Sequence, residues 1–184
     1  MIDFKKNIQS ERVFLRPMQL TDFEGMVNHT TDSAMWYYFT ADLSDSTILK
    51  KWIENAVNEL HRKESLPFTI ISPHNGEIIG ATRIGNISRI HKRVEIGWTW
   101  IAKKYQRTGI NGHVKKLLFD YLFKETDTLR IEFKTDVLNI PARKAMEKAG
   151  LTKEGILRSH TLMTNNRRRD TLYYSILKDE WNKK

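Results

Sequence analysis

Hydrophobic side chains recur along this chain with two different periods. Over residues 48–60, and again over 110–122, they recur about every 3.6 positions, which predicts two amphipathic helices. Asp45 or Ser46 is expected to cap the first of these helices. Over residues 130–138 hydrophobic and polar side chains alternate, which predicts a half-buried strand.

Capping residues place two shorter helices. The stretch Thr21-Asp22-Phe23-Glu24 matches a capping box and predicts a helix from Asp22 to about Thr30. Asn139 is expected to cap a further helix, and Gly150 is expected to end it.

The remaining segments are predicted to be strands. Asn75-Gly76 favours a tight hairpin turn between strands over 67–72 and 77–86. Further strands are expected over 13–18, over 93–101, and as two strands between 153 and 177 that join near Asn165-Asn166. The order β-α-α-β-β-β-α-β-α-β-β predicts an α/β (α+β) fold with a mixed, mostly antiparallel sheet flanked by helices, in which a strand–helix–strand step forms one parallel pair. We treat residues 1–184 as a single domain because no repeat or linker interrupts them.

Composition narrows the classes of function. The chain has 31 Lys and Arg against 22 Asp and Glu, a net charge of +9 that favours anionic ligands. It has no cysteine, which excludes disulfides, thiolate metal sites and a cysteine acyl intermediate. No window is apolar enough to span a membrane, and the N-terminus does not read as a signal peptide. We therefore expect a cytoplasmic protein without a metal.

The segment with the clearest chemistry follows the strand over 93–101. The stretch Gln106-Arg107-Thr108-Gly109-Ile110-Asn111-Gly112 leads into a predicted helix, whose free N–H groups favour a negative charge. Gly109 and Gly112 would let a ligand come close to the backbone. The pattern is neither a Walker loop nor a dinucleotide fingerprint, so it predicts a phosphate site of another kind.

Two of these motifs resemble the GCN5-related N-acetyltransferases. The loop Gln106-Arg107-Thr108-Gly109-Ile110-Asn111 is similar to the pyrophosphate loop of that family. The segment from Asn139 to Leu151 is similar to a second motif of the family, and the order of the elements matches from about Arg12 to Trp181. The branch that holds ribosomal-protein N-terminal acetyltransferases is the most similar.

The resemblance implies an enzyme that transfers an acetyl group from acetyl-coenzyme A (acetyl-CoA) to a primary amine by direct attack in a ternary complex. In that family the strand ending at Ile101 and the strand ending at Leu138 splay apart, and the pantetheine arm lies between them. The resemblance assigns cofactor binding to Trp98, Trp100, Ile101, Gln106, Arg107, Thr108, Gly109, Ile110, Asn111, Gly112 and Asn139.

Glu95 is the candidate general base, because the amine must lose a proton before it can attack. Alternation places Glu95 with Gly97 and Thr99, opposite Trp98 and Trp100. Three positions depart from the family pattern, because Asn111 replaces a Gly or Ala, Ala142 a Ser and Met146 a Tyr. Neither Ala142 nor Met146 can protonate the departing thiolate. Water or one of four side chains would have to do so, namely His91, Tyr105, His160 or Tyr173.

The acceptor and the oligomeric state are left open. Arg158, His160 and the run 167–169 make the last hairpin basic, which favours an acidic acceptor such as a peptide N-terminus with acidic neighbours, although small amines stay open. The aromatic stretch 35–39 either packs in the core or lines a substrate groove.

Two other functions compete with the enzyme, namely a nucleic-acid-binding module and an inactive CoA-binding regulator. The basic residues are spread along the chain without a nucleic-acid-binding motif, which disfavours the first. Whether the chain forms a homodimer is not decided.

Overall fold

A computed structural model describes residues 1–164 and 166–183 of the chain. One sheet of eight strands runs through it, in the order β1-β2-β3-β4-β5-β6-β8-β7. The strands are β1 (Ile8–Gln9), β2 (Phe14–Pro17), β3 (Leu66–Ile71), β4 (Ile78–Ser88), β5 (Arg93–Ile101), β6 (Arg130–Asp136), β7 (Thr152–Leu162) and β8 (Arg168–Leu177). The helices are α1 (Asp22–Thr30), α2 (Ser46–His61), α3 (Ile110–Glu125), α4 (Ile140–Lys148) and α5 (Lys178–Asn182), with short 3₁₀ turns at η1 (Ser33–Trp36) and η2 (Lys103–Tyr105).

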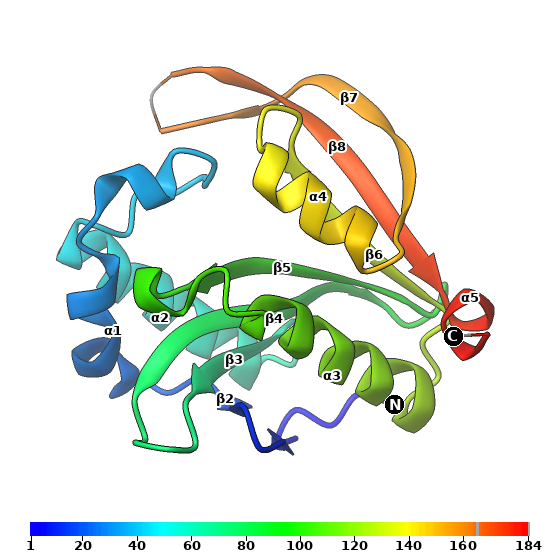
Figure 1. Ribbon diagram of the computed structural model, residues 1–184, viewed down its shortest axis with the longest axis horizontal. Coiled ribbons are helices and arrows are strands. Elements are labelled where there is room, and N and C mark those ends of the chain that lie inside the picture. Colours follow the sequence, from blue (N-terminus) through cyan, green and yellow to red (C-terminus); the bar gives the residue numbers. More distant parts are fainter. Residues whose placement is uncertain (165, 184) are drawn as a thin grey trace.

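Helices cover the sheet on two faces, and each face has its own hydrophobic cluster. Val114 and Leu118 of α3 pack in one cluster with strand residues such as Ile96. Leu49 and Ile53 of α2 pack in the other, together with residues of α1 and η1. In Figure 1, α3 lies in front of the sheet and α2 behind it, while α4 and the β7–β8 hairpin arch above β5. The mixed, mostly antiparallel sheet expected from the sequence is confirmed.

The parallel pair predicted from the sequence is β5 with β6, and it is short. The two strands pair at Arg93↔Arg130, Val94↔Ile131 and Glu95↔Glu132 and then part. Beyond that point β5 stays paired with β4 as far as Ile101. All of β6 stays paired with β8. Each strand therefore follows a different neighbour, and a gap opens between them.

A bulge in β5 accompanies this parting. Three steps along β5, from Gly97 to Trp100, face two steps along β4, from Arg83 to Ala81. Trp98 takes up the extra residue with a left-handed backbone, at a φ of 52°. The expectation that Glu95 and the two tryptophans lie on opposite faces is therefore wrong. After the bulge, Trp100 packs in the α2-side cluster with Ala81.

Most of the predicted caps and turns are confirmed. Asp45 caps α2, accepting hydrogen bonds from the N–H groups of Thr47 and Ile48 at 2.7 and 3.2 Å. Asn139 caps α4 through the Ala142 N–H at 3.2 Å. Gly76 turns the β3–β4 hairpin with a φ of 70°. The last hairpin also forms, although Asn165 lies outside the described residues.

The predicted capping box at Thr21 is wrong. Thr21 has helical backbone angles and makes no side-chain capping bond. The helix still begins at Asp22, whose carboxylate accepts a hydrogen bond from the Gln19 N–H at 2.9 Å. The same buried carboxylate also binds the guanidinium of Arg16 and the hydroxyl of Thr69. These partners from two neighbouring strands fix the start of α1 in place of a local cap.

The close pairing of β4 with β5 depends on a glycine. A Cβ on Gly80 would lie 2.3 Å from the carbonyl oxygen of Trp100. We expect Gly80→Ala to lower the free energy of unfolding by about 2 to 3 kcal/mol, because the two strands would have to move apart. Gly155→Ala in β7 is the matched control, since its Cβ would meet no described atom within 4 Å. Urea unfolding measures both variants, and equal stability of the two would contradict this prediction.

Candidate active site

A cavity of about 350 Å³ lies where β5 and β6 part. Its walls come from every element around the gap. They include Glu95, Ile96, Gly97, Trp98 and Thr99 of β5, Phe133, Lys134 and Thr135 of β6, Asn111 and Lys115 of α3, Asn139, Ala142, Ala145 and Met146 at α4, His160, Thr161 and Arg169 of the hairpin, and Tyr38, Phe39 and Thr40 before α2.

Glu95 lies in this cavity at the last residue pair between β5 and β6. Only 6% of its surface is exposed. Its Oε2 accepts hydrogen bonds from Asn86 Nδ2 at 2.6 Å and from Lys134 Nζ at 2.7 Å. Its Oε1 has no hydrogen-bond partner within residues 1–164 and 166–183, and lies 3.4 Å from where a Cβ on Gly97 would be. One oxygen is therefore held by two partners, and the other is available to a ligand in the cavity.

Lys134 stays charged beside this carboxylate. Burial lowers the pKa of Lys134, but the hydrogen bond and the charge of Glu95 outweigh burial and raise the pKa above its ordinary value. The ammonium also lies 5.2 Å from the centre of the Tyr173 ring. The Lys134 ammonium is therefore held between the Glu95 side chain and the Tyr173 ring.

The segment over 106–112, called the 106–112 loop here, leads from η2 into α3 and includes the first residues of that helix. It passes through left-handed backbone at Arg107 and at Gly109, with φ angles of 63° and 87°. The first hydrogen bond of α3 runs from the His113 N–H to the Gly109 carbonyl at 3.0 Å. The N–H groups of residues 110–112 therefore precede the helical ladder, where the helix dipole favours an anion. A Cβ on Gly112 would meet no described atom within 4 Å, so this turn is open.

Two polar side chains of the 106–112 loop are used within the protein. Gln106 Nε2 donates to the Ile101 carbonyl at 2.9 Å, which ties the loop to the end of β5. The Thr108 hydroxyl donates to the Tyr105 carbonyl at 2.6 Å. These two residues therefore shape the loop, and the backbone N–H groups of residues 110–112 are left for a ligand.

Arg12 adds a positive charge beside this loop. Its Nη2 donates to the Thr108 carbonyl at 2.9 Å. Its terminal nitrogens lie 3.6 and 3.8 Å from where a Cβ on Gly109 would be. Sequence reasoning missed this residue because 96 positions separate Arg12 from Thr108 and no local motif joins them.

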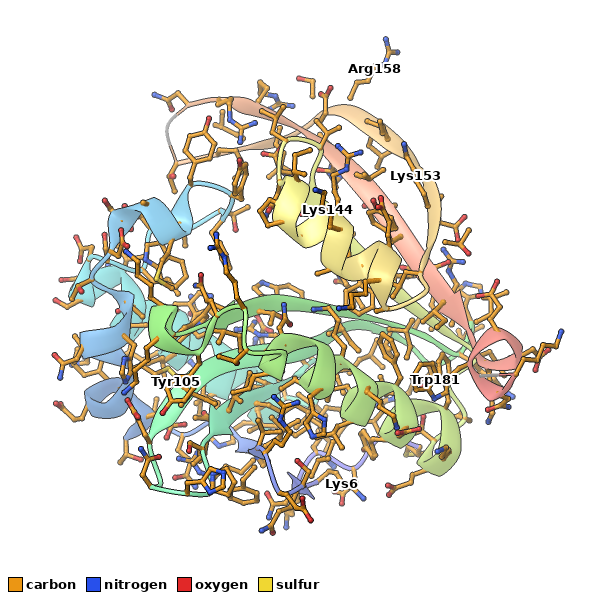
Figure 2. The ribbon with its side chains drawn as sticks, viewed as in Figure 1. Lys6, Tyr105, Lys144, Lys153, Arg158 and Trp181 are labelled. Carbon is orange, nitrogen blue, oxygen red and sulfur yellow. The ribbon has the colours of Figure 1, made fainter. Side chains whose placement is uncertain are left out.

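Glu77 fixes the segment just before the loop. Its Oε1 pairs with Lys104 Nζ at 2.5 Å and with His29 Nε2 at 3.0 Å. Its Oε2 accepts a hydrogen bond from the Tyr105 hydroxyl at 2.8 Å. The bonds from Lys104 and Tyr105 lower the pKa of Glu77 to about 2. Tyr105, labelled in Figure 2, is thereby linked to the β3–β4 hairpin and to α1.

The hairpin side of the cavity is basic and aromatic. Arg167 binds the buried carboxylate of Asp136, and its guanidinium lies 5.3 Å from the centre of the Tyr37 ring. This contact connects the hairpin to the aromatic stretch. Trp36 of that stretch is buried in the core, as one of the two expectations had it, whereas Tyr38 and Phe39 line the cavity.

Arg169 is the arginine of the hairpin that lines the cavity. Its Nε donates to the Thr171 hydroxyl at 3.0 Å, and its terminal nitrogens have no hydrogen-bond partner in the part of the chain that the structure describes. Burial lowers the pKa of Arg169, and the charges of Asp136 and Glu95 only partly oppose this. Each of these carboxylates is already paired with another cation.

Comparison with known proteins decides the family. Residues 12–152 match the family model described as an acetyltransferase (GNAT) domain, which is more than half of the chain. The chain belongs to the GNAT acetyltransferase family. GNAT enzymes transfer an acetyl group from acetyl-CoA, and this chain is an N-acetyltransferase of that kind.

Similar proteins extend over almost the whole chain. The "Putative ribosomal N-acetyltransferase YdaF" of Bacillus subtilis (strain 168) is 26% identical over 181 residues, which cover 94% of each chain. A GCN5-related N-acetyltransferase from Brucella melitensis has the same fold, with a TM-score of 0.87 at 21% identity over 97% of this chain and 81% of that one. A ribosomal-protein-S5-alanine acetyltransferase from Vibrio fischeri has a TM-score of 0.79 at 19% identity, over 96% of this chain and 98% of that one.

The site residues fit the donor of a GNAT enzyme. The open N–H groups of the 106–112 loop suit a diphosphate. The cavity between β5 and β6 continues from that loop through Asn111 and reaches Trp98 and Asn139. Trp100 and Ile101 are buried side chains, so only their backbone could meet a ligand. No group of three or more metal-ligating side chains occurs among the described residues. No helix in the described ranges is long and apolar enough to cross a membrane.

The departures from the GNAT pattern also lie in the cavity. Ala142 and Met146 both line it, and neither side chain carries an acidic proton to donate. Of the four side chains considered as alternative acids, His160 lines the cavity, with Nδ1 at 3.0 Å from the Thr171 hydroxyl oxygen. Tyr105 is bound to Glu77, and His91 is exposed in the β4–β5 turn.

Acid should weaken the support that Glu77 gives to this site. We expect Glu77→Gln to lower the free energy of unfolding near neutral pH by about 1 kcal/mol. Because the pKa falls from 4.5 to about 2 on folding, this contribution is complete above about pH 5 and is lost as the pH falls toward 2. Denaturant unfolding of both proteins at several pH values measures the difference, which should shrink in acid. A difference that stays constant would contradict the assignment.

Proposed function

We propose that this GNAT enzyme acetylates a primary amine that carries a negative charge nearby, with Glu95 as the general base. The observation that carries the proposal is the buried Glu95 carboxylate, which has one oxygen held by Asn86 and Lys134 and the other without a partner among the described residues. Its position in the cavity between β5 and β6 supports this role.

In this proposal each part of the site has a separate task. The N–H groups of the 106–112 loop bind the diphosphate, while Asn139 and the edge of β5 orient the pantetheine arm. Bound acetyl-CoA supplies the acetyl group as a thioester. The acceptor arrives as an ammonium, which is not a nucleophile, and Glu95 Oε1 takes its proton. Lys134 and Asn86 keep the carboxylate in place during this transfer.

Charge supports an anionic group on the acceptor. Arg169 lines the cavity together with Glu95, and each nearby carboxylate is already paired with another cation. A carboxylate close to the acceptor amine would therefore bind Arg169. Arg158 does not face this region, because Figure 2 shows it projecting away from the molecule. Because two similar proteins are named for ribosomal substrates, peptides with an acidic residue near the N-terminus are the first acceptors to test.

Replacing the base tests the mechanism. We expect Glu95→Gln to lower kcat at least about 100-fold, because a positioned general base contributes that much or more. The dissociation constant for acetyl-CoA should stay within about twofold, since the carboxylate is assigned to the acceptor. Steady-state kinetics by thiol release, with calorimetry for donor binding, measures both.

The neighbouring strand offers a control for this variant. Glu132 faces Glu95 across the parallel pair, but its carboxylate binds Arg93 and Arg130 and does not line the cavity. Glu132→Gln should keep kcat within a few-fold. An unchanged kcat in Glu95→Gln would show that Glu95 is not the general base. A wild-type protein that binds acetyl-CoA without turnover would favour the inactive regulator.

Acceptor recognition has its own test. Arg169→Gln should raise KM about 10- to 100-fold for a carboxylate-bearing amine, since a charged hydrogen bond is lost. It should leave KM unchanged for the matching carboxamide. Arg168→Gln is the control, because Arg168 is exposed and its Nε donates to Ser159 Oγ at 3.0 Å. Equal effects of Arg169→Gln on the two acceptors would contradict the assignment.

A further inference from the structure

Lys115 is a buried cation that has no part in the mechanism proposed above. It lies on α3 and lines the cavity, with only 7% of its surface exposed. Its Nζ donates to Asn111 Oδ1 at 2.6 Å. An ammonium has three N–H donors, and no carboxylate within the described residues forms an ion pair with this one.

Such a charge opposes folding. Burial lowers the pKa of Lys115 to about 8, and no neighbouring carboxylate opposes this shift. The side chain is still mostly protonated at neutral pH, so the ligand-free protein holds an ammonium that is largely withdrawn from water. Arg83 shows the usual arrangement, because this buried guanidinium binds Glu59 at 2.8 Å and stacks on Trp98.

The ammonium lies beside the first turn of α3. A helical side chain points toward the N-terminus of its helix, which brings Lys115 to Asn111, one turn earlier. Asn111 itself belongs to the 106–112 loop, whose N–H groups precede the helical ladder. Its side-chain oxygen accepts the hydrogen bond from Lys115, and this bond fixes the orientation of the Asn111 side chain. The Lys115 charge therefore lies next to the first turn of α3, which carries the free N–H groups.

We propose that Lys115 binds the diphosphate of the acyl donor, an assignment that rests on the proposed donor site in the 106–112 loop. The diphosphate supplies the counter-charge that the protein does not, and its oxygens accept the remaining N–H donors of the ammonium. The same residue then destabilises the ligand-free protein and stabilises the donor complex. Asn111 positions Lys115 for this contact.

Lys115→Met separates these two effects. The melting temperature of the ligand-free variant should equal or exceed that of the wild type, because a buried charge without a counter-charge is removed. The dissociation constant for acetyl-CoA, measured by calorimetry, should rise about 10- to 100-fold, because a charged hydrogen bond is lost. Lys116→Met is the matched control, since Lys116 is exposed and pairs with Asp120 at 2.8 Å. That variant should bind acetyl-CoA like the wild type.

A shorter donor identifies the group that Lys115 binds. S-acetylpantetheine has no diphosphate, so its inhibition constant should be the same for the wild type and for Lys115→Met. An equal loss for both donors would overturn the assignment to the diphosphate, as would unchanged binding of acetyl-CoA. A lower melting temperature in both Lys115→Met and Lys115→Gln, with donor affinity intact, would show a structural role and also overturn it. Wild-type protein that binds no acetyl-CoA would refute the donor site itself.

Discussion

The parting of β5 from β6 is the constraint on which the site depends. After Glu95 the two strands no longer pair, because β5 follows β4 through the bulge at Trp98 while β6 follows β8. A continuous sheet would fill this space with hydrogen bonds and side chains. The gap instead leaves two strand edges with a cavity between them, and α3 begins at its end. The buried Glu95 and Asn111, in the first turn of α3, therefore line the same cavity.

The distribution of charge supports a division of this cavity between two anionic ligands. Elsewhere in the fold buried charges have partners, as Arg83 has Glu59 and Asp22 has Arg16. At the cavity, Lys115 and Arg169 have no carboxylate of their own among the described residues. A protein selected only for stability would pair or remove such groups. Their presence in the lining of one cavity fits a donor diphosphate bound by Lys115 and an anionic acceptor bound by Arg169.

Local signals in the sequence predicted much of this fold and part of the site. Asp45, Asn139 and Gly76 mark caps and turns whose chemistry lies within a few neighbouring residues, and all three are confirmed. The 106–112 loop could be predicted because its glycines and the following helix are contiguous. The bulge at Trp98 could not, since it depends on how β5 pairs with two different strands. Arg12 contacts the 106–112 loop from a distant segment, and Asp22 binds residues of two strands. The periodicity of hydrophobic positions cannot reveal such contacts.

A crystal structure of the protein with coenzyme A bound would show whether the gap between β5 and β6 holds the donor. We expect a diphosphate on the N–H groups of residues 110–112, with the pantetheine arm between β5 and β6 and the sulfur beside Glu95. Coenzyme A bound on another surface, or a diphosphate held away from that turn with the gap between the strands empty, would contradict it.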